Sequence, residues 1–480
     1  MNPLAAGFQD EFSAFSLLIT LYFATFNTAQ LMLLLVAFRA VRRRMHDLRY
    51  EDFGDIRQSG LAPPVSVIVP AYNEGPTIVD TVRALLALEY PGLEIVVIND
   101  GSTDDTLERL ASEFQLGRTP RVYWQQLRSQ PVRGIYWNPA YANLWVLDKA
   151  NGRKADAINA GVNLASAPYV SVIDGDTIIE HQAVLAMMHA ILPRSAETLA
   201  AGGTVRIVNG CRLEGTHAVQ VGLPGSWLAR AQILEYLRSF LFGRVGWGEL
   251  HSLLIVSGAF GIFRKDALVE IGGFRHDTVG EDMDVVVRLH RNSRERGRPY
   301  RVAFVPDPVC WTECPETLRG LRQQRERWQR GLGETLEHNR IMLANRRYGR
   351  LGLLALPYYM FFEYLAPLIE TAAFVILPFG WALGLVHPAS FLLFSIASFL
   401  YGLLLSVFAL LLEELSFRRY RAPGQLVRLL LVAVLETFLL RPLQVWWRLV
   451  ALVTWRGRPL SWQSVPRRGL RGLERAARAS

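Results

Sequence analysis

The segment Pro168-Tyr-Val-Ser-Val-Ile-Asp-Gly-Asp176 decides the fold of this chain. Its apolar half predicts a strand buried in a parallel sheet, and such sheets bind ligands just outside the carboxyl ends of their strands. Asp174 and Asp176 stand at that end, one residue apart. Their carboxylates offer a hard oxygen site that suits Mg²⁺ or Mn²⁺ and a diphosphate, although Asp and Gly are also ordinary turn residues.

Two earlier apolar runs end in the same way. Residues 65–69 predict a strand followed by Tyr72 and Glu74, and residues 93–98 predict a strand followed by Asp100. Right-handed crossovers bring several such strand ends to one crevice. Acids that accept hydrogen bonds from a base or ribose, with a tyrosine that can stack on the base, indicate a nucleotide site. The alternative for Asp100 is an ordinary turn or helix-cap aspartate.

A lysine stands between the second and third of these strand ends. Lys154 opens the predicted helix Lys154-Ala-Asp-Ala-Ile-Asn-Ala-Gly161. An ammonium group at that place can neutralise phosphate. The alternative is a solvated surface lysine, which is the usual place for this residue type.

Two further acids open another predicted helix. Val279-Gly-Glu-Asp-Met283 leads into a helix predicted over 283–290. A helix N-terminus stabilises the ionised form of Asp282, which could then act as general base toward an acceptor hydroxyl. Glu281 is the alternative base. An acid in the first turn of a helix is also common without any catalytic role.

The run Gln323-Gln-Arg-Glu-Arg-Trp328 precedes the second apolar region of the chain. Its residues follow one another along a predicted helix. Arg327 could pair with pyrophosphate, and Trp328 could cover the face of a sugar ring. A helix at a membrane interface would use the same residue types, and the two roles can coexist.

Apolar segments flank a region of soluble character over 60–345, where 254–256 and 259–263 predict further strands. Residues 13–38 carry no charge and are followed by a cluster of arginines. About 20 apolar residues cross a bilayer, and a basic cluster marks the cytoplasmic end. We therefore expect residues 1–45 to be a transmembrane anchor with the N-terminus outside. A cleaved signal peptide, the alternative, would carry its charge before a shorter apolar core.

The C-terminal part predicts two transmembrane helices within 350–415, over 351–386 and 391–412. Residues 429–440 are too short to cross a bilayer. We therefore interpret 416–480 as an interfacial or re-entrant segment with a basic cytoplasmic tail, because a further crossing would leave that tail outside. Glu363 and Glu370 are candidates to line a polar path there.

The net charge of +9 comes from 52 basic and 43 acidic residues. Much of the excess lies in the tail, where anionic lipid headgroups are favoured over nucleic acid as partners. Cys310 and Cys314 are four residues apart, and a zinc site needs about four ligands. We expect these cysteines and Cys211 to be buried small side chains.

In this order, the motifs resemble those of the membrane-integrated family-two glycosyltransferases, which include synthases of cellulose, hyaluronan, chitin and poly-N-acetylglucosamine. The resemblance covers about residues 63–335 and the flanking spans. Val146-Leu-Asp-Lys-Ala-Asn-Gly-Arg-Lys154 is most similar to the bacterial poly-N-acetylglucosamine synthase branch. Two positions depart from the family: Gly280 stands where threonine is usual, and Asn99 where many members carry a second aspartate.

The resemblance implies an α/β GT-A fold, Rossmann-like with a mostly parallel sheet, which binds a UDP-sugar and Mg²⁺ or Mn²⁺. It implies roles for the residues singled out above. Asp100 and Asp174 would contact the nucleotide, Asp176 the metal, Asp282 would be the base, and the acceptor end and the diphosphate would be held by Gln324, Arg327 and Trp328.

The expected function is that of an inverting hexosyl- or N-acetylhexosaminyltransferase that extends a β-linked polysaccharide from a UDP-sugar. It would work at the cytoplasmic face of the inner (plasma) membrane, processively and with export. Membrane lipids and cell-envelope subunits are the further expected partners, and nucleic acid is not. The alternatives are a non-processive transferase that glycosylates a lipid-linked acceptor, and a membrane scaffold without catalysis.

Overall fold

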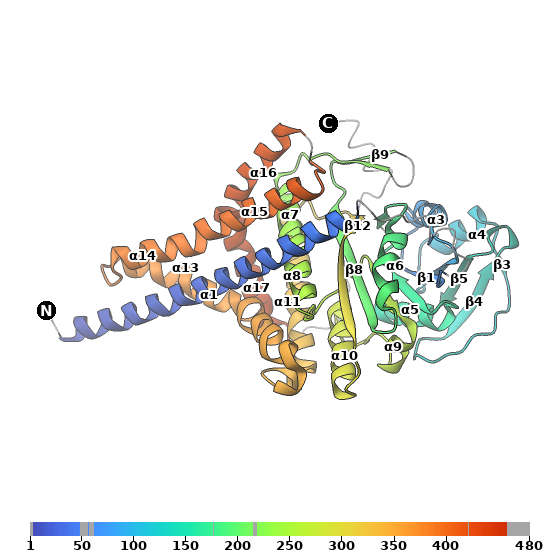
Figure 1. Ribbon diagram of the computed structural model, residues 1–480, viewed down its shortest axis with the longest axis horizontal. Coiled ribbons are helices and arrows are strands. Elements are labelled where there is room, and N and C mark those ends of the chain that lie inside the picture. Colours follow the sequence, from blue (N-terminus) through green and yellow to red (C-terminus); the bar gives the residue numbers. More distant parts are fainter. Residues whose placement is uncertain are drawn as a thin grey trace.

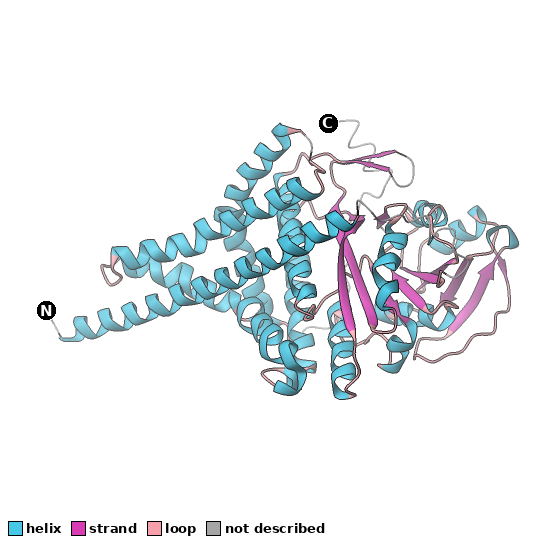
Figure 2. Ribbon diagram, viewed as in Figure 1, coloured by secondary structure: helices cyan, strands magenta, loops and turns pink. Residues whose placement is uncertain are grey.

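The computed structural model describes residues 3–48, 56, 62–175, 177–214, 218–420 and 422–457. Asp176 and the predicted basic tail beyond 457 lie outside the described residues. An α/β domain built on a central sheet occupies one end of the molecule, and long helices extend from it at the other end (Figures 1 and 2).

The sheet of the α/β domain has ten strands in the order β3-β4-β5-β2-β1-β6-β11-β8-β12-β7. Its neighbours β5, β2, β1 and β6 are parallel, as are β8 and β12, whereas β11 runs antiparallel between the two groups. The predicted α/β fold is confirmed, with a mixed sheet. The strands are β1 (Val65–Ala71), β2 (Leu93–Asn99), β3 (Gly117–Arg118), β4 (Val132–Trp137), β5 (Leu144–Lys149), β6 (Tyr169–Val172), β7 (Ile178–Ile179), β8 (Thr198–Ile207), β11 (Gly261–Arg264) and β12 (Arg301–Thr312), and β9 (Arg212–Glu214) pairs separately with β10 (Ala218–Gln220).

The strand predicted at 254–256 is wrong. This segment pairs with no strand, yet Leu254 and Val256 are fully buried. Val256 lies against the sheet, 3.1 Å from the place that a Cβ on Gly202 of β8 would occupy. The run is apolar because it crosses a face of the sheet, which a short apolar run does not reveal. The strand predicted at 259–263 begins later, at Gly261.

Helices cover the sheet of the α/β domain (Figure 2). One of them, α5, packs on β1 and β2. Gly161 allows this close approach, since a Cβ there would lie 2.5 Å from Cγ2 of Ile68. The helices of this domain are α3 (Ile78–Leu86), α4 (Thr106–Glu113), η1 (Pro139–Tyr141), α5 (Arg153–Leu164), α6 (Ala183–Ile191), η2 (Leu192–Arg194), α7 (Trp227–Leu237), η3 (Arg238–Arg244), α8 (Val245–Glu249), α9 (Lys265–Glu270), α10 (Glu281–Glu295), α11 (Leu318–His338), η4 (Arg340–Met342) and η5 (Arg346–Tyr348).

Helices outside this domain form a bundle that extends away from the sheet (Figure 1). By length and composition, Glu11–Asp47 and Pro388–Ser416 could each cross a membrane, and Leu351–Tyr364 with Ala366–Ala382, bent by 42°, could form a third span. Pro367 stands at the start of the second of these bent pieces. The bundle contains α1 (Pro3–Asp47), η6 (Leu351–Ala355), α12 (Leu356–Tyr358), η7 (Tyr359–Tyr364), α13 (Ala366–Ala382), α14 (Pro388–Ser395), η8 (Ile396–Leu400), α15 (Tyr401–Ser416), α16 (Pro423–Leu435), η9 (Glu436–Leu440) and α17 (Arg441–Thr454).

Ion pairs join the bundle to the α/β domain. Arg44, near the end of α1, contacts Asp307 of β12 at 2.9 Å. Arg206 of β8 forms two hydrogen bonds to Glu413 of α15, at 2.9 and 2.7 Å, and both side chains are almost completely buried. A buried charge without its partner is strongly unfavourable, so these contacts tie the sheet to the helices.

Candidate active site

The acids at the strand ends meet at one edge of the sheet. Tyr72 and Glu74 follow β1, and Tyr72 is 49% exposed. Glu74 reaches the end of β6, because a Cβ on Gly175 would lie 3.6 Å from Cγ of Glu74. Asp100 follows β2, where its amide N–H donates to the carbonyl of Ala71 at 2.9 Å. The predicted nucleotide-binding residues therefore share one rim.

Asp100 is part of a buried ion cluster. Its Oδ1 accepts a hydrogen bond from the amide of Gly152 at 3.0 Å and pairs with Lys149. Lys149 is 0% exposed and also contacts Asp156 at 2.6 Å. Burial raises the pKa of Asp100, and Lys149 opposes that effect. These contacts differ from those of a simple turn or cap residue. The buried ammonium group of Lys149 holds the carboxylate of Asp100 in place.

Lys154 lies among three carboxylates rather than on the open surface. Its Nζ is 2.5 Å from Oδ1 of Asp174 and 3.6 Å from Oε1 of Glu281. A Cβ on Gly258 would lie 3.2 Å from Nζ of Lys154 and 3.6 Å from Oδ2 of Asp282. Burial lowers the pKa of Lys154, but Asp174, Glu281 and Asp282 outweigh it and raise that pKa. The ammonium group therefore stays charged at the centre of this cluster.

The N-terminus of α10 provides two of these carboxylates. The helix begins at Glu281, two residues earlier than predicted, and Asp282 lies in its first turn. Oδ1 of Asp282 accepts a hydrogen bond from the amide of Met283 at 2.9 Å. Glu281 is buried, and burial raises its pKa, opposed by Lys154 and reinforced by Asp282. A carboxyl that burial pushes toward its neutral form is the weaker candidate for an ionised base.

The glycine that departs from the family pattern has a steric explanation. Gly280 precedes α10, and no side chain caps that helix. A Cβ on Gly280 would lie 2.8 Å from Cα of Gly331 in α11. The two helices approach through their backbones here, so a threonine at 280 does not fit.

Helix α11 carries the third group of predicted residues. Trp328 is 41% exposed, and the guanidinium of Arg325 stacks 4.3 Å from its ring centroid. Arg327 lies close enough to lower the pKa of Glu281, which connects this helix to the cluster around Lys154. Oε1 of Gln324 is buried and has no hydrogen-bond partner among the described residues. All three predicted residues thus lie on an element that borders the site.

A divalent metal fits the donor chemistry that the structure describes. Asp174 offers a partly exposed carboxylate at the end of β6, and hard cations prefer such oxygens. The other predicted ligand, Asp176, lies outside the described residues. Within the described ranges, no group of three or more His, Cys, Asp and Glu side chains is arranged to hold a metal ion.

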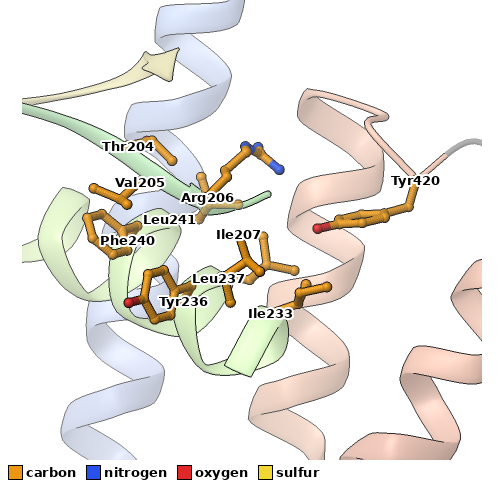
Figure 3. A pocket seen from close by; sticks show the side chains of 10 residues that line it. All are labelled: Thr204, Val205, Arg206, Ile207, Ile233, Tyr236, Leu237, Phe240, Leu241 and Tyr420. Atoms are coloured by element: carbon orange, nitrogen blue, oxygen red, sulfur yellow. The ribbon is translucent and has the colours of Figure 1, made fainter. Parts of the chain in front are cut away.

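Two charged residues near the site were not predicted from the sequence. Lys149 stands within a motif that the resemblance quoted, but no spacing rule predicted its ion pairs with Asp100. Arg244 ends η3 beside the ring of Phe240 and has no sequence motif around it. A small pocket lined by Phe240, Arg206, Tyr236 and Tyr420 among others contains none of the predicted site residues (Figure 3).

An α/β domain with acids gathered at the strand ends, followed by a helix that leads to apolar spans, is the arrangement expected of a membrane-integrated glycosyltransferase. Residues 63–331 match the family model described as "Glycosyltransferase like family 2", and the chain belongs to this family. The predicted GT-A fold and family are thereby confirmed.

Curated relatives agree with this assignment. The chain is 30% identical over 272 residues to a poly-beta-1,6-N-acetyl-D-glucosamine synthase of Staphylococcus epidermidis, over 57% of this chain and 55% of the relative. It is 30% identical over 274 residues to the enzyme of the same name from Staphylococcus aureus strain COL, over the same shares. The chain thus spans about half the length of the curated relatives it matches.

A solved structure shares the fold. The mannosyltransferase PcManGT from Pyrobaculum calidifontis, in complex with GDP-Man and Mn²⁺, superposes with a TM-score of 0.50 at 17% identity. The match covers 88% of this chain and 99% of that one.

Proposed function

We propose that this chain is an inverting glycosyltransferase that moves an N-acetylhexosamine or another hexose from a UDP-sugar to a growing β-linked polysaccharide. The observation that carries the proposal is the cluster of Asp174, Glu281 and Asp282 around Lys154 at the strand ends. The names of the staphylococcal relatives support a polysaccharide as product and N-acetylglucosamine as the transferred sugar.

The donor would lie along the edge that β1, β2 and β6 share. Tyr72 is exposed for stacking on the base, and Glu74 and Asp100 can accept hydrogen bonds from base or ribose. Lys154 can move from Asp174 to a diphosphate oxygen, because both partners offer it a negative charge. Asp174 and Asp176 would hold Mg²⁺ or Mn²⁺, whose charge would offset that of the departing diphosphate.

Asp282 would act as the general base. Its carboxylate takes the proton of an acceptor hydroxyl while that oxygen forms a bond to the anomeric carbon. The bond between the anomeric carbon and the diphosphate oxygen breaks in the same step, so UDP leaves and the anomeric centre inverts. Glu281 instead holds Lys154 from the buried side.

Helix α11 would place the acceptor end beside the base. Trp328 presents its exposed ring as a plate for a sugar, while Gln324 and Arg327 provide polar groups to the acceptor and the diphosphate. Arg325 does not compete for these ligands, because Glu235 already accepts two of its hydrogen bonds, at 2.5 and 2.8 Å.

We infer that the catalytic domain faces the cytoplasm and that the product leaves through the bundle. The basic end of α1 is the end attached to the α/β domain (Figure 1), as the positive-inside rule requires. Glu370 is 8% exposed and lies 3.2 Å from Arg441 of α17, so it faces protein, as a polar path needs. Glu363 lies 3.5 Å from Arg448 of the same helix.

We infer that segment 416–457 lies at the membrane interface. In the structure α17 packs against both α11 and α13. This contact holds it beside the catalytic domain, where a re-entrant or interfacial helix belongs.

Incubation of membranes that carry the protein with individual radiolabelled UDP-sugars tests the function. We expect one UDP-sugar to yield a polymer that a linkage-specific β-glycosidase degrades. Asp282→Asn should abolish the product, whereas Asp277→Asn, which changes a surface acid paired with Arg275, should leave it unchanged. A single-sugar glycolipid would favour the lipid-linked alternative, and no metal-dependent turnover of any UDP-sugar would favour the scaffold.

A further inference from the structure

Two neighbouring arginines follow α15, and they lie in different surroundings. Arg418 is exposed and contacts no acid within the described ranges. Nη1 and Nη2 of Arg419 instead donate hydrogen bonds to Oε1 and Oε2 of Glu180 in the α/β domain, at 2.7 and 3.2 Å. Arginines that follow an apolar span usually lie among lipid headgroups. Arg419 departs from this use, because its guanidinium contacts the α/β domain.

Glu180 connects the turn after α15 to the sheet. Its Oε1 also accepts a hydrogen bond from Nε1 of Trp311 at 3.2 Å, and Trp311 of β12 is fully buried. The side chains of Glu180 and Arg419 are each 28% exposed. An ion pair that is held at two points and partly shielded from water is stronger than an ordinary exposed pair.

Glu180 stands shortly after the acid at the end of β6. The amide of Thr177 donates to the carbonyl of Asp174 at 3.0 Å, which closes a turn, and β7 follows this turn. β7 is an edge strand of only two residues, and both pair with β12. Such a short strand makes few backbone hydrogen bonds, so the side-chain contacts of Glu180 are needed to fix where this segment lies.

We propose that Arg419 is a positioning residue for the donor site. Through Glu180 it holds β7, and with β7 the turn that begins at Asp174, in the place that a diphosphate and its cation require. This inference rests on the proposed function. The turn after α15 thereby couples the bundle to donor binding. Because coupling between two sites is reciprocal, donor binding also stabilises the contact of that turn with the α/β domain.

The test measures the binding of UDP by calorimetry, in the presence of Mn²⁺, to the full chain in lipid nanodiscs. Arg419→Gln should weaken UDP binding about threefold to tenfold, as expected for loss of a partly buried two-point ion pair. The acceptor KM should stay within about twofold and the Tm should change little, since Glu180 keeps Trp311 as a donor and is partly open to water. Arg419→Lys should restore part of the UDP affinity, because it keeps the charge but loses the fork.

Arg418→Gln is the matched control, because it removes the same charge from the neighbouring position, where no described acid is in contact. Its UDP affinity should equal that of the wild type. If Arg418→Gln weakened UDP binding as much as Arg419→Gln, the effect would be one of net charge, and the proposal would be wrong. An unchanged UDP affinity of Arg419→Gln would also overturn it.

A double variant tests whether Arg419 acts through Glu180. Glu180→Gln keeps an acceptor for Trp311 and removes the charge that Arg419 contacts. Combined with Arg419→Gln, it should weaken UDP binding no further than Arg419→Gln does alone, because both changes break one interaction. Additive losses would show that the two side chains act independently and would refute the proposed route.

Hydrogen exchange of residues 413–420 gives a second readout that needs no turnover. UDP with Mn²⁺ should slow this exchange in the wild type but not in Arg419→Gln. If the wild type binds UDP and turns over no UDP-sugar, the proposed function fails, and weaker UDP binding by Arg419→Gln would still support the inference. If the wild type turns over a UDP-sugar and both proteins bind UDP equally, only the inference fails. A wild type that binds no UDP would overturn the inference as well.

Discussion

The close contact between Gly280 and Gly331 predicts that the threonine usual in the family would damage this chain. A Cβ on Gly280 would lie 2.8 Å from Cα and 2.9 Å from the carbonyl oxygen of Gly331. Ordinary van der Waals contact of a Cβ begins at 3.4 Å, so α10 and α11 must separate by roughly 0.6 Å. Both atoms belong to backbone, which leaves no side chain to rotate away.

Overpacking of this kind costs about 1–3 kcal/mol of folding free energy. The strained position is two residues from Asp282, so the base moves with it. Since a displacement of about 1 Å can cost a factor of about 100 in rate, Gly280→Thr should lower kcat by at least about tenfold. Gly331→Ala should have a similar effect, because its Cβ would lie 2.9 Å from Cα of Gly280.

UDP release by the purified protein and its thermal unfolding measure both effects. Gly424→Thr is the matched control, because a Cβ at that glycine meets nothing within 4 Å. It should keep the wild-type kcat and Tm. If Gly280→Thr also kept both values, the two helices would not be in backbone contact, and the explanation for the missing threonine would be refuted.

Three further predictions concern charged groups of the catalytic domain. Lys154→Met leaves the surrounding carboxylates without an opposing charge, so it should lower the free energy of unfolding by about 3 kcal/mol and raise the donor KM. Lys154→Arg should restore part of both values. Wild-type values for the methionine variant would exclude a role for this charge. Asp282→Asn should lower kcat by roughly 100- to 10,000-fold with UDP-sugar affinity intact by calorimetry, and a loss below tenfold would exclude it as the base. Burial lowers the pKa of His290 to about 4. The stability that depends on the neutral ring is therefore fully present above the ordinary histidine pKa of 6.5 and is lost as the pH falls from 6.5 toward 4. The Tm should therefore fall over this pH range in the wild type and fall less in His290→Gln. Parallel curves of Tm against pH for the two proteins would count against this role of His290.

The strand-end acids could be predicted because their signal is local. An apolar run followed by Asp or Glu specifies both the strand and the edge at which the side chain lies, and β1, β2 and β6 follow that rule. Asp100 and Asp174 accordingly lie where the sequence predicts.

Strands β8 and β12 could not be predicted in this way. β8 is rich in small residues, Thr198 to Ile207, and β12 contains Pro306 and Pro308, which argue against a central strand. The structure accommodates those prolines at a register shift between Val305 and Val309. The pairing depends on partners distant in sequence, so no local pattern reports it.

The charges of Lys149 and Arg244 escaped prediction for a related reason. A buried lysine and a solvated one have the same sequence, and only the contact of Lys149 with Asp100 and Asp156 separates them. The stretch 124–145 contains β4 and leads into β5, where Trp137 and Trp145 stack with centroids 5.4 Å apart. These two aromatic residues pack at the margin of the sheet.

The buried pair of Arg206 and Glu413 has a practical consequence for anyone who wishes to work with a truncated enzyme. Residues 63–331 contain the arginine but not the glutamate. A protein cut to this region would therefore keep the buried charge of Arg206 on β8 without the carboxylate that now pairs with it. The same cut would also uncover the apolar face of α7 that α15 and α16 now shield. The family-matched region is therefore not a self-sufficient folding unit, and biochemistry on this chain should begin from the intact polypeptide extracted with its lipids.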